Sequence, residues 1–286
     1  MKTLLLAIAL VISVPAYSAT PVPSGRWSFV FTDAKGRPDR PIRVYTYRPP
    51  KCDSTCPILF AMSGAKRNAY DYLGFWELAA DRNRFIVIAP EFTAERWPRA
   101  AAYNLGDVEG QGNREKWAYS AVEHIYDEVW DGQKGYMIYG HSAGAQFVQR
   151  MSILLPDNRA TVMILGNPGW FMMPEWRKDK GAESNPYSLI GSPAGEADLK
   201  KALARRIIVL VGDNDNEPDP DNLNQNAAVK KQGDTRVDRG ENFIKAATSA
   251  AQDLGVKLGW ELVEMPPTAQ DAAAVAKAAG EALYGK

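Results

Sequence analysis

The chain has 286 residues, with 34 basic and 34 acidic side chains and a formal net charge of zero. This length permits one large α/β domain around a single core. The balanced charge, without a visible basic stripe, argues against nucleic-acid binding. Repeats and low-complexity tracts are also absent from the sequence, so nothing divides the chain into smaller units.

Residues 1–18 have the pattern of a secretory signal peptide. Lys2 supplies the positive charge at the N-terminus, and residues 4–14 form an apolar run of the length that the hydrophobic region of a signal peptide needs. Small residues at Ala16 and Ser18 favour cleavage after Ser18, which predicts a secreted or periplasmic protein with a single domain over residues 19–286. An uncleaved anchor is the alternative, but the run is too short to span a bilayer. No membrane contact is expected after cleavage.

The two cysteines, Cys52 and Cys56, lie close together in the segment PPKCDSTCPILF. In an exported protein this spacing favours a disulfide that closes a small loop. Half of a metal site is the alternative, but no histidine cluster lies nearby to complete it.

Strand-like and helix-like patterns alternate along most of the chain. Residues 26–33 and 42–49 alternate apolar and polar side chains, which predicts an opening antiparallel pair. Strands separated by helices then imply a mostly parallel sheet with right-handed crossovers. The further strands are expected at 57–64, 85–92, 135–140, 161–167, 206–213 and 258–265, and helices near 68–81, 114–130, from 142, near 236–254 and at 271–284.

The segment GHSAGA, residues 140–145, stands between an apolar strand and a helical pattern. A G-x-S-x-G motif in this context is typical of a nucleophile elbow, in which the glycines leave room for a strained serine. Ser142 is therefore the candidate nucleophile. The alternative is a glycine-rich turn without a reaction.

The chain resembles the α/β-hydrolase superfamily, in particular its secreted esterases and polyester depolymerases. The resemblance rests on this motif and extends from the strand PILFAMSG to the last helix. The resemblance implies a serine hydrolase with the order Ser, acid, His. It implies the acid at Asp215, three residues after Gly212, with Asp213 as the second choice. A polar turn or a cation-binding loop are the alternatives for this acidic segment.

A small-molecule or polymeric ester is the substrate that the resemblance implies, and no cofactor or metal is expected. The oxyanion hole is expected from the N–H groups of Ala143 and Ala65. Relatives often carry His-Gly where this chain has Ser63-Gly64, and an ordinary strand-ending turn is the alternative. Trp170 either lines an acyl pocket or packs in the core. The oligomeric state is not predicted.

Gln270 occupies the position where the resemblance implies the catalytic histidine, in the segment EMPPTAQDAAAV. Imidazole accepts and returns a proton near neutral pH, whereas a glutamine amide does neither. Loss of a triad histidine lowers turnover by about a millionfold, or about 8 kcal/mol of barrier. The alternative is that Gln270 simply begins the last helix.

No other group is expected to replace the missing imidazole. His141 adjoins Ser142 but is expected to pack, and His124 is expected on a helix away from the site, as an i,i+4 partner of Glu128. Lys66 would need an unusual fold-back to reach Ser142. The sequence therefore predicts an esterase fold with weak or absent activity. A ligand-binding or partner-binding protein without catalysis, or an engineered inactive variant, are the alternatives.

Overall fold

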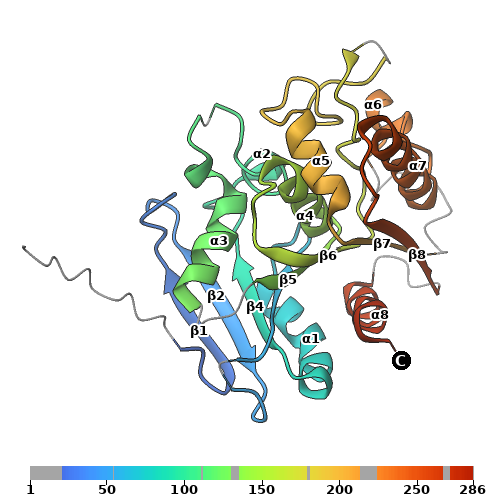
Figure 1. Cartoon of the computed structure of the whole chain (residues 1–286). Coiled ribbons are helices and arrows are strands. Elements are labelled where there is room, and N and C mark those ends of the chain that lie inside the picture. The colour runs from blue at the N-terminus through green and yellow to red at the C-terminus, as the bar shows by residue number, and fades with distance from the viewer. Residues whose placement is uncertain are drawn as a thin grey trace, which may run out of the picture.

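The computed structural model describes residues 21–53, 55–110, 112–129, 135–178, 181–212, 224–266 and 271–285. The expected signal peptide, the acid candidates Asp213 and Asp215, and Gln270 lie outside these described residues. The described strands form one sheet with the order β1-β2-β4-β3-β5-β6-β7-β8 (Figure 1).

Two antiparallel pairings open the sheet, and the remaining strands are parallel. β1 (Gly25–Phe31) pairs with β2 (Ile42–Arg48), which pairs with β4 (Ile86–Glu91). This confirms the predicted opening pair and the mostly parallel sheet. The parallel strands that follow are β3 (Ile58–Met62), β5 (Tyr136–His141), β6 (Ala160–Gly166), β7 (Ile207–Gly212) and β8 (Trp260–Met265).

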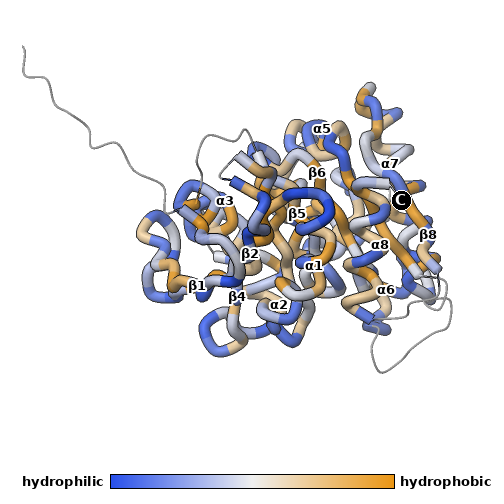
Figure 2. The backbone as a smooth tube through the Cα atoms, turned by 90° about the horizontal axis from the view of Figure 1, so that it is seen from below, coloured by the Kyte–Doolittle hydropathy of each residue, from blue (hydrophilic) through white to orange (hydrophobic). Residues whose placement is uncertain are grey.

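The inner strands are continuous apolar runs because helices cover both faces of the sheet. Every residue of β3 and of β7 is buried. Figure 2 shows much of the tube around the labels β5, β6 and β8 in the orange of apolar residues. The buried strand expected within residues 57–64 is confirmed over Ile58–Met62.

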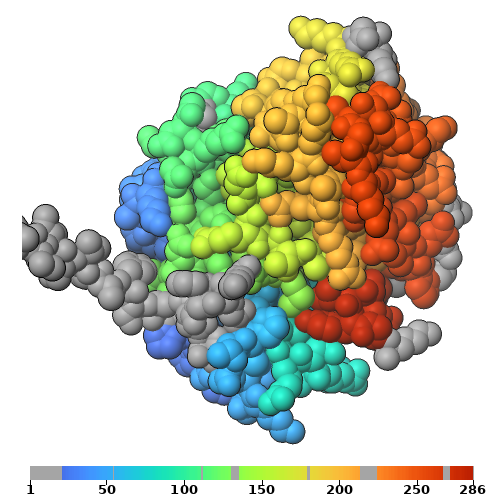
Figure 3. All heavy atoms as spheres, in the orientation of Figure 1, coloured from blue at the N-terminus to red at the C-terminus, as the bar shows by residue number. Residues whose placement is uncertain are grey.

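Helices form a layer on each side of the sheet (Figure 1). One side carries α1 (Ala69–Asn83) and α8 (Ala272–Tyr284), which pack against each other and appear side by side in Figure 3. The other side carries α3 (Ala118–Val129), α4 (Ala143–Leu154), α5 (Glu196–Ala204) and α7 (Arg236–Leu254).

Three short elements complete the described secondary structure: α2 (Arg99–Ala102), α6 (Ala227–Lys230) and the 3-10 helix η1 (Arg114–Lys116). The single helix expected near 114–130 is therefore divided into η1 and α3. Helices α2, α5 and α6 were not predicted from the sequence, because they are too short to show a clear helical periodicity. None of the described helices combines the length and the apolar character that crossing a bilayer requires.

The expected disulfide joins Cys52 to Cys56, whose Cα atoms are 5.7 Å apart. It closes the short connection between β2 and β3. Because β3 leads directly to the Ser63-Gly64 turn, the disulfide lies at the start of the strand that positions the candidate site.

Candidate active site

Ser142 lies between the last residue of β5 and the first residue of α4, with φ 52° and ψ −114°. A positive φ at a residue with a Cβ costs about 1–3 kcal/mol and is concentrated at functional sites. The N–H of Ser142 donates to the Gly166 carbonyl at 2.8 Å, and its own carbonyl accepts from the Gln146 N–H at 3.1 Å. The Ser142 side chain makes no capping hydrogen bond to α4, so its hydroxyl is not committed to the helix N-terminus.

The two glycines of the motif are required by close backbone contacts. A Cβ at Gly140 would lie 2.1 Å from the carbonyl oxygen of Gly144, and a Cβ at Gly144 would lie 2.3 Å from that of Met62. Both distances are far below a normal van der Waals contact. The turn around Ser142 therefore packs tightly against itself and against the end of β3.

The turn that carries Ala65 lies against the turn that carries Ala143. A Cβ at Gly64 would lie 3.6 Å from the His141 carbonyl oxygen, and the Ser63 carbonyl accepts a hydrogen bond of 2.6 Å from the Tyr103 hydroxyl. Ala65 is exposed and Ala143 half-buried. The two segments thus meet beside Ser142, and the use of their N–H groups as an oxyanion hole stays a prediction.

Arg67 fixes the same turn and was not singled out from the sequence. Its guanidinium lies 3.9 Å from the ring centre of Tyr103 and donates to the carbonyls of Phe92 and Trp97 at 2.8 and 3.2 Å, and to that of Arg99 at 3.1 Å. Since these acceptors are backbone atoms of a distant loop, no side-chain pattern signals them. Arg67 therefore ties the β3–α1 turn to the loop after β4.

His141 is buried, as expected, with 5% of its surface exposed. Its Nδ1 lies 2.7 Å from the Tyr72 hydroxyl, and a Cβ added at Gly64 would lie 3.1 Å from that same hydroxyl. This buried hydrogen bond fixes the orientation of the imidazole ring. Burial, aided by the charge of Arg236, lowers the pKa of His141 to about 4. A neutral, buried ring of this kind is a poor proton acceptor for Ser142.

The other histidine, His124, has different partners from the one expected. Its Nδ1 lies 2.8 Å from an Asp33 carboxylate oxygen and its Nε2 lies 2.7 Å from one of Glu115, so Glu128 is not the partner of its ring nitrogens. Burial acts to lower the pKa of His124, but the hydrogen bonds and charges of the two carboxylates outweigh it and the pKa is raised. The ring joins α3 to the β1–β2 connection, which agrees with its predicted place outside the site.

The N-terminus of α8 lies next to the strand ends that surround Ser142. A Cβ at Gly166, the end of β6, would lie 2.5 Å from the Val275 side chain. Asp271 begins this helix, with its carboxylate accepting from the N–H groups of Ala273 and Ala274 at 2.9 and 3.1 Å, and its charge acts to raise the pKa of His141. The residue that follows Gln270 is therefore close to the Ser142 turn, although Gln270 itself lies outside the described residues.

Lys66 and Trp170 are the remaining side chains that the sequence singled out near the site. Lys66 is exposed. Trp170 is 9% exposed, its ring centre lies 5.1 Å from that of Tyr187 in a tilted arrangement, and its indole nitrogen lies 2.9 Å from the side-chain amide of Gln146. Its packing role is thus evident, and a role in an acyl pocket stays a prediction. Within the described segments, no group of three histidine, cysteine or carboxylate side chains is placed to hold a metal ion.

Comparison with known proteins places this geometry in a family. No family model and no curated protein matches the sequence. Among solved structures, the chain is similar to poly(aspartic acid) hydrolase-1 from Sphingomonas sp. KT-1, with 31% identity, a TM-score of 0.83, and coverage of 91% of this chain and 98% of that one. The chain belongs to the α/β-hydrolase superfamily.

Two further structures support this α/β-hydrolase assignment. LpqC, a poly(3-hydroxybutyrate) depolymerase from Bordetella parapertussis, is 29% identical, with a TM-score of 0.85 over 92% of this chain and 90% of that one. An S-formylglutathione hydrolase from Agrobacterium tumefaciens is 15% identical, with a TM-score of 0.58 over 93% of this chain and 96% of that one, and shares the fold alone. The esterase-like and depolymerase-like hydrolase fold expected from the sequence is therefore confirmed.

Proposed function

We propose that this α/β-hydrolase is an exported protein of the serine carboxylesterase type, with Ser142 as its nucleophile and with weak or absent turnover because Gln270 replaces the catalytic histidine. The observation that carries the proposal is the strained backbone of Ser142 at the β5–α4 turn. Strain at a non-glycine residue persists only where the surroundings impose it, and the Gly140 and Gly144 contacts supply that constraint.

The substrate class in this proposal is a small-molecule or polymeric ester. In the first step a bond would form between Ser142 Oγ and the ester carbonyl carbon, while the carbonyl electrons move onto oxygen. The N–H groups of Ala65 and Ala143 would hold that oxyanion. The bond to the leaving alkoxide then breaks, and the alkoxide needs the proton that Oγ has lost.

In this proposal the chain lacks a group that can transfer the proton from Ser142 Oγ to the leaving alkoxide. Asp215 would orient an imidazole and stabilise its charged form, but a glutamine amide at position 270 cannot carry the proton between the two oxygens. His141 is neutral, buried and bound to Tyr72, and His124 is held between Asp33 and Glu115. These two environments favour the second candidate function, a ligand-binding or partner-binding protein without turnover. An engineered inactive variant would have the same properties.

Restoring the imidazole tests the proposal. We expect Gln270→His to raise the hydrolysis of a chromogenic short-chain ester by at least about a thousandfold, given the cost of losing a triad histidine. Gln270→Asn, which keeps an amide, is the matched control and should show no gain. Adding Ser142→Ala to the histidine variant should remove the gained rate. Equal rates for the original chain and Gln270→His would overturn the role of Gln270.

The reactivity of Ser142 is tested separately with a fluorophosphonate. We expect slow modification of the original chain and fast modification of Gln270→His, with the label on Ser142 in a peptide map. Fast labelling of Ser142 in the original chain would show that another base is at work.

Export is tested by expressing the whole chain in a bacterium and determining the N-terminus of the product in the periplasm or medium. We expect the mature chain to begin at Ala19. A product that stays in the cytoplasm with residues 1–18 attached would contradict the export part of the proposal.

A further inference from the structure

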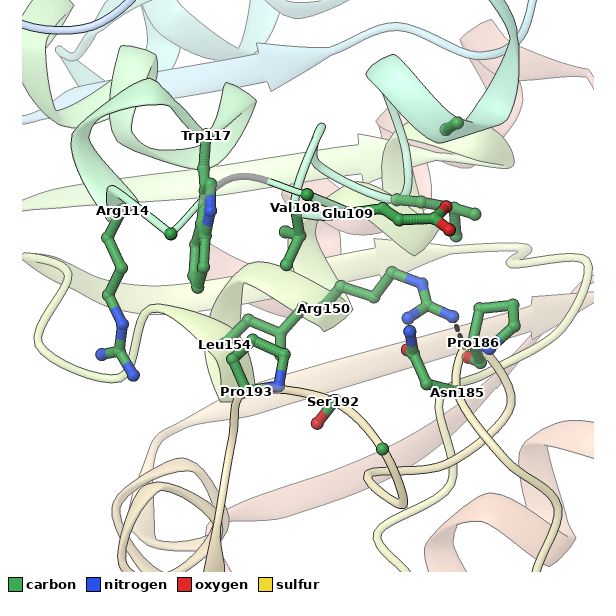
Figure 4. Close-up of a pocket in the computed structure, with 15 residues that line it drawn as sticks. Val108, Glu109, Arg114, Trp117, Arg150, Leu154, Asn185, Pro186, Ser192 and Pro193 are labelled. Carbon is green, nitrogen blue, oxygen red and sulfur yellow. Dashed lines mark hydrogen bonds between the residues drawn. The ribbon is translucent and has the colours of Figure 1, made fainter.

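A large cavity of about 990 Å³ lies beside α4, apart from the Ser142 turn. One wall comes from residues within 101–110 and 112–117, which follow β4, and another from residues 185–193, which follow β6. Both segments leave the sheet at the edge where Ser142 stands, because β4, β5 and β6 are parallel. In Figure 4, Arg114 and Trp117 lie to the left and Asn185 and Pro186 to the right, with Arg150 reaching toward the latter pair.

Arg150 is a buried cation in the wall of this cavity, with 2% of its surface exposed. Its Nη2 donates to the Pro186 carbonyl, and its guanidinium lies 4.9 Å from the ring centre of Trp170. Its Nε is buried and has no hydrogen-bond partner among the described residues. The side chain therefore keeps donor capacity that the described part of the protein does not use.

No carboxylate of the described residues forms an ion pair with Arg150. The acidic and basic side chains that share the cavity wall, Glu109 and Arg114, are both exposed. Burial lowers the pKa of Arg150 to about 10, so the guanidinium still carries its charge at neutral pH. A buried cation without an anionic partner is unfavourable, and an anion that enters the cavity would remove this penalty.

We propose that Arg150 binds a carboxylate of an oligomeric ester substrate that extends from Ser142 into this cavity. Arg150 follows Ser142 by eight residues on α4, which is a rise of about 12 Å along the helix. A substrate must therefore be several units long to occupy both places. The planar guanidinium fork fits a carboxylate, whereas a neutral ester group offers it no charge. The identity of the ligand as a substrate rests on the proposed function, but its binding does not require turnover.

The test compares two ligands that differ by one charge: a linear trimer of 3-hydroxybutyrate with a free carboxylate, and the methyl ester of that trimer. Binding is measured by calorimetry on the whole chain with Ser142→Ala, so that no ligand is consumed. We expect the acid to bind at least about tenfold more tightly than the methyl ester, as a hydrogen bond to a charged group provides. Equal affinities, or no binding of the acid, would overturn the proposal.

Two variants assign the preference to Arg150. Arg150→Lys keeps the positive charge, and thus the best chance of folding, but lacks the fork, so we expect it to lose most of the preference. Arg150→Gln should lose all of it. Arg114→Gln removes an exposed cation from the same cavity and should change the preference by less than about threefold. A preference that is kept in Arg150→Lys and lost in Arg114→Gln would show that Arg114, and not Arg150, binds the carboxylate. That result would overturn the proposal.

Hydrolysis of the methyl ester by Gln270→His, measured in parallel, separates the two proposals. Hydrolysis without a carboxylate preference refutes the Arg150 site alone. A carboxylate preference without hydrolysis in any variant refutes the esterase proposal and leaves the Arg150 site as a binding site.

Discussion

The hydroxyl of Tyr72 lies 2.7 Å from Nδ1 of His141, the residue that precedes Ser142. The same hydroxyl also lies against Gly64, the residue that precedes Ala65, where an added Cβ would be 3.1 Å from it. One phenol on α1 thus connects the two turns that are expected to supply the nucleophile and one oxyanion donor. A positioning role for Tyr72 follows from this arrangement.

Tyr72→Phe should lower the kcat for a short-chain ester by about tenfold in the Gln270→His background, because the loss of one buried hydrogen bond loosens both turns. KM should change little, since the phenol does not face the substrate. Tyr70→Phe is the matched control, because Tyr70 is 48% exposed on the same helix. A Tyr72→Phe variant with an unchanged kcat would remove the positioning role.

His141 should make the fold lose stability in acid. Its pKa is lowered to about 4 in the folded state, against the ordinary 6.5 of an unfolded chain, so unfolding takes up a proton between these values. Its contribution is present above pH 6.5 and lost as the pH falls toward 4, with a limit of about 3 kcal/mol. His141→Gln, which can still accept from Tyr72, should flatten this part of the pH profile in urea unfolding. A variant whose profile parallels that of the original chain would contradict the lowered pKa.

His124 should contribute to the stability of the fold with the opposite dependence on pH. Its pKa is raised in the folded state, so the folded chain holds the proton more firmly than the unfolded chain. The stabilisation is present below pH 6.5 and lost as the pH rises through the raised value. Because the chain has two histidines, an NMR titration of the two ring signals separates them directly. We expect one midpoint above 6.5 that falls in Asp33→Asn, and two midpoints below 6.5 would refute this assignment.

Gly144→Ala should destabilise the protein by about 1–3 kcal/mol or more, because the added methyl group would lie 2.3 Å from the Met62 carbonyl oxygen. Gly112→Ala is the control, since a Cβ there meets nothing within 4 Å. The comparison is made by urea unfolding. Equal midpoints for the two variants would show that the Ser142 turn is less tightly packed than described.

Reduction of the Cys52–Cys56 disulfide should lower the free energy of unfolding by about 2 kcal/mol, which is the limit for so short a loop. Unfolding in urea with and without a reductant measures this. Cys52→Ser combined with Cys56→Ser is the control, and should be insensitive to the reductant. A loss much larger than 2 kcal/mol would indicate that the disulfide also maintains the packing of β3.

The sequence predicted the sheet well because its strands are long apolar runs between helical patterns, and residues 57–64 and 206–213 show this most clearly. It did not predict α5, because the segment EADLKKALA is short and has only two large apolar side chains. Helical spacing suggested Glu128 as the partner of His124, whereas a carboxylate 91 residues away holds that ring. Sequence periodicity predicts which side chains are neighbours within one helix or strand. It does not predict contacts between residues that are far apart in the sequence.

The part of the candidate site that carries a sequence motif was predictable. The G-x-S-x-G spacing located the turn at Ser142, and its strained backbone follows from that motif. Arg67 and Arg150 were missed because both donate to backbone carbonyls of remote loops, and any residue type provides a carbonyl. The role of Asp215 as the acid and the position of Gln270 in the place of a catalytic histidine stay predictions.

Asp271 holds the first turn of α8 through the N–H groups of Ala273 and Ala274. The start of this helix therefore does not depend on the side chain that precedes it. Glutamine and histidine codons differ only in their third base, so a single nucleotide change exchanges the two residues without disturbing that anchor. The gene is thus one point mutation away from a histidine codon at position 270.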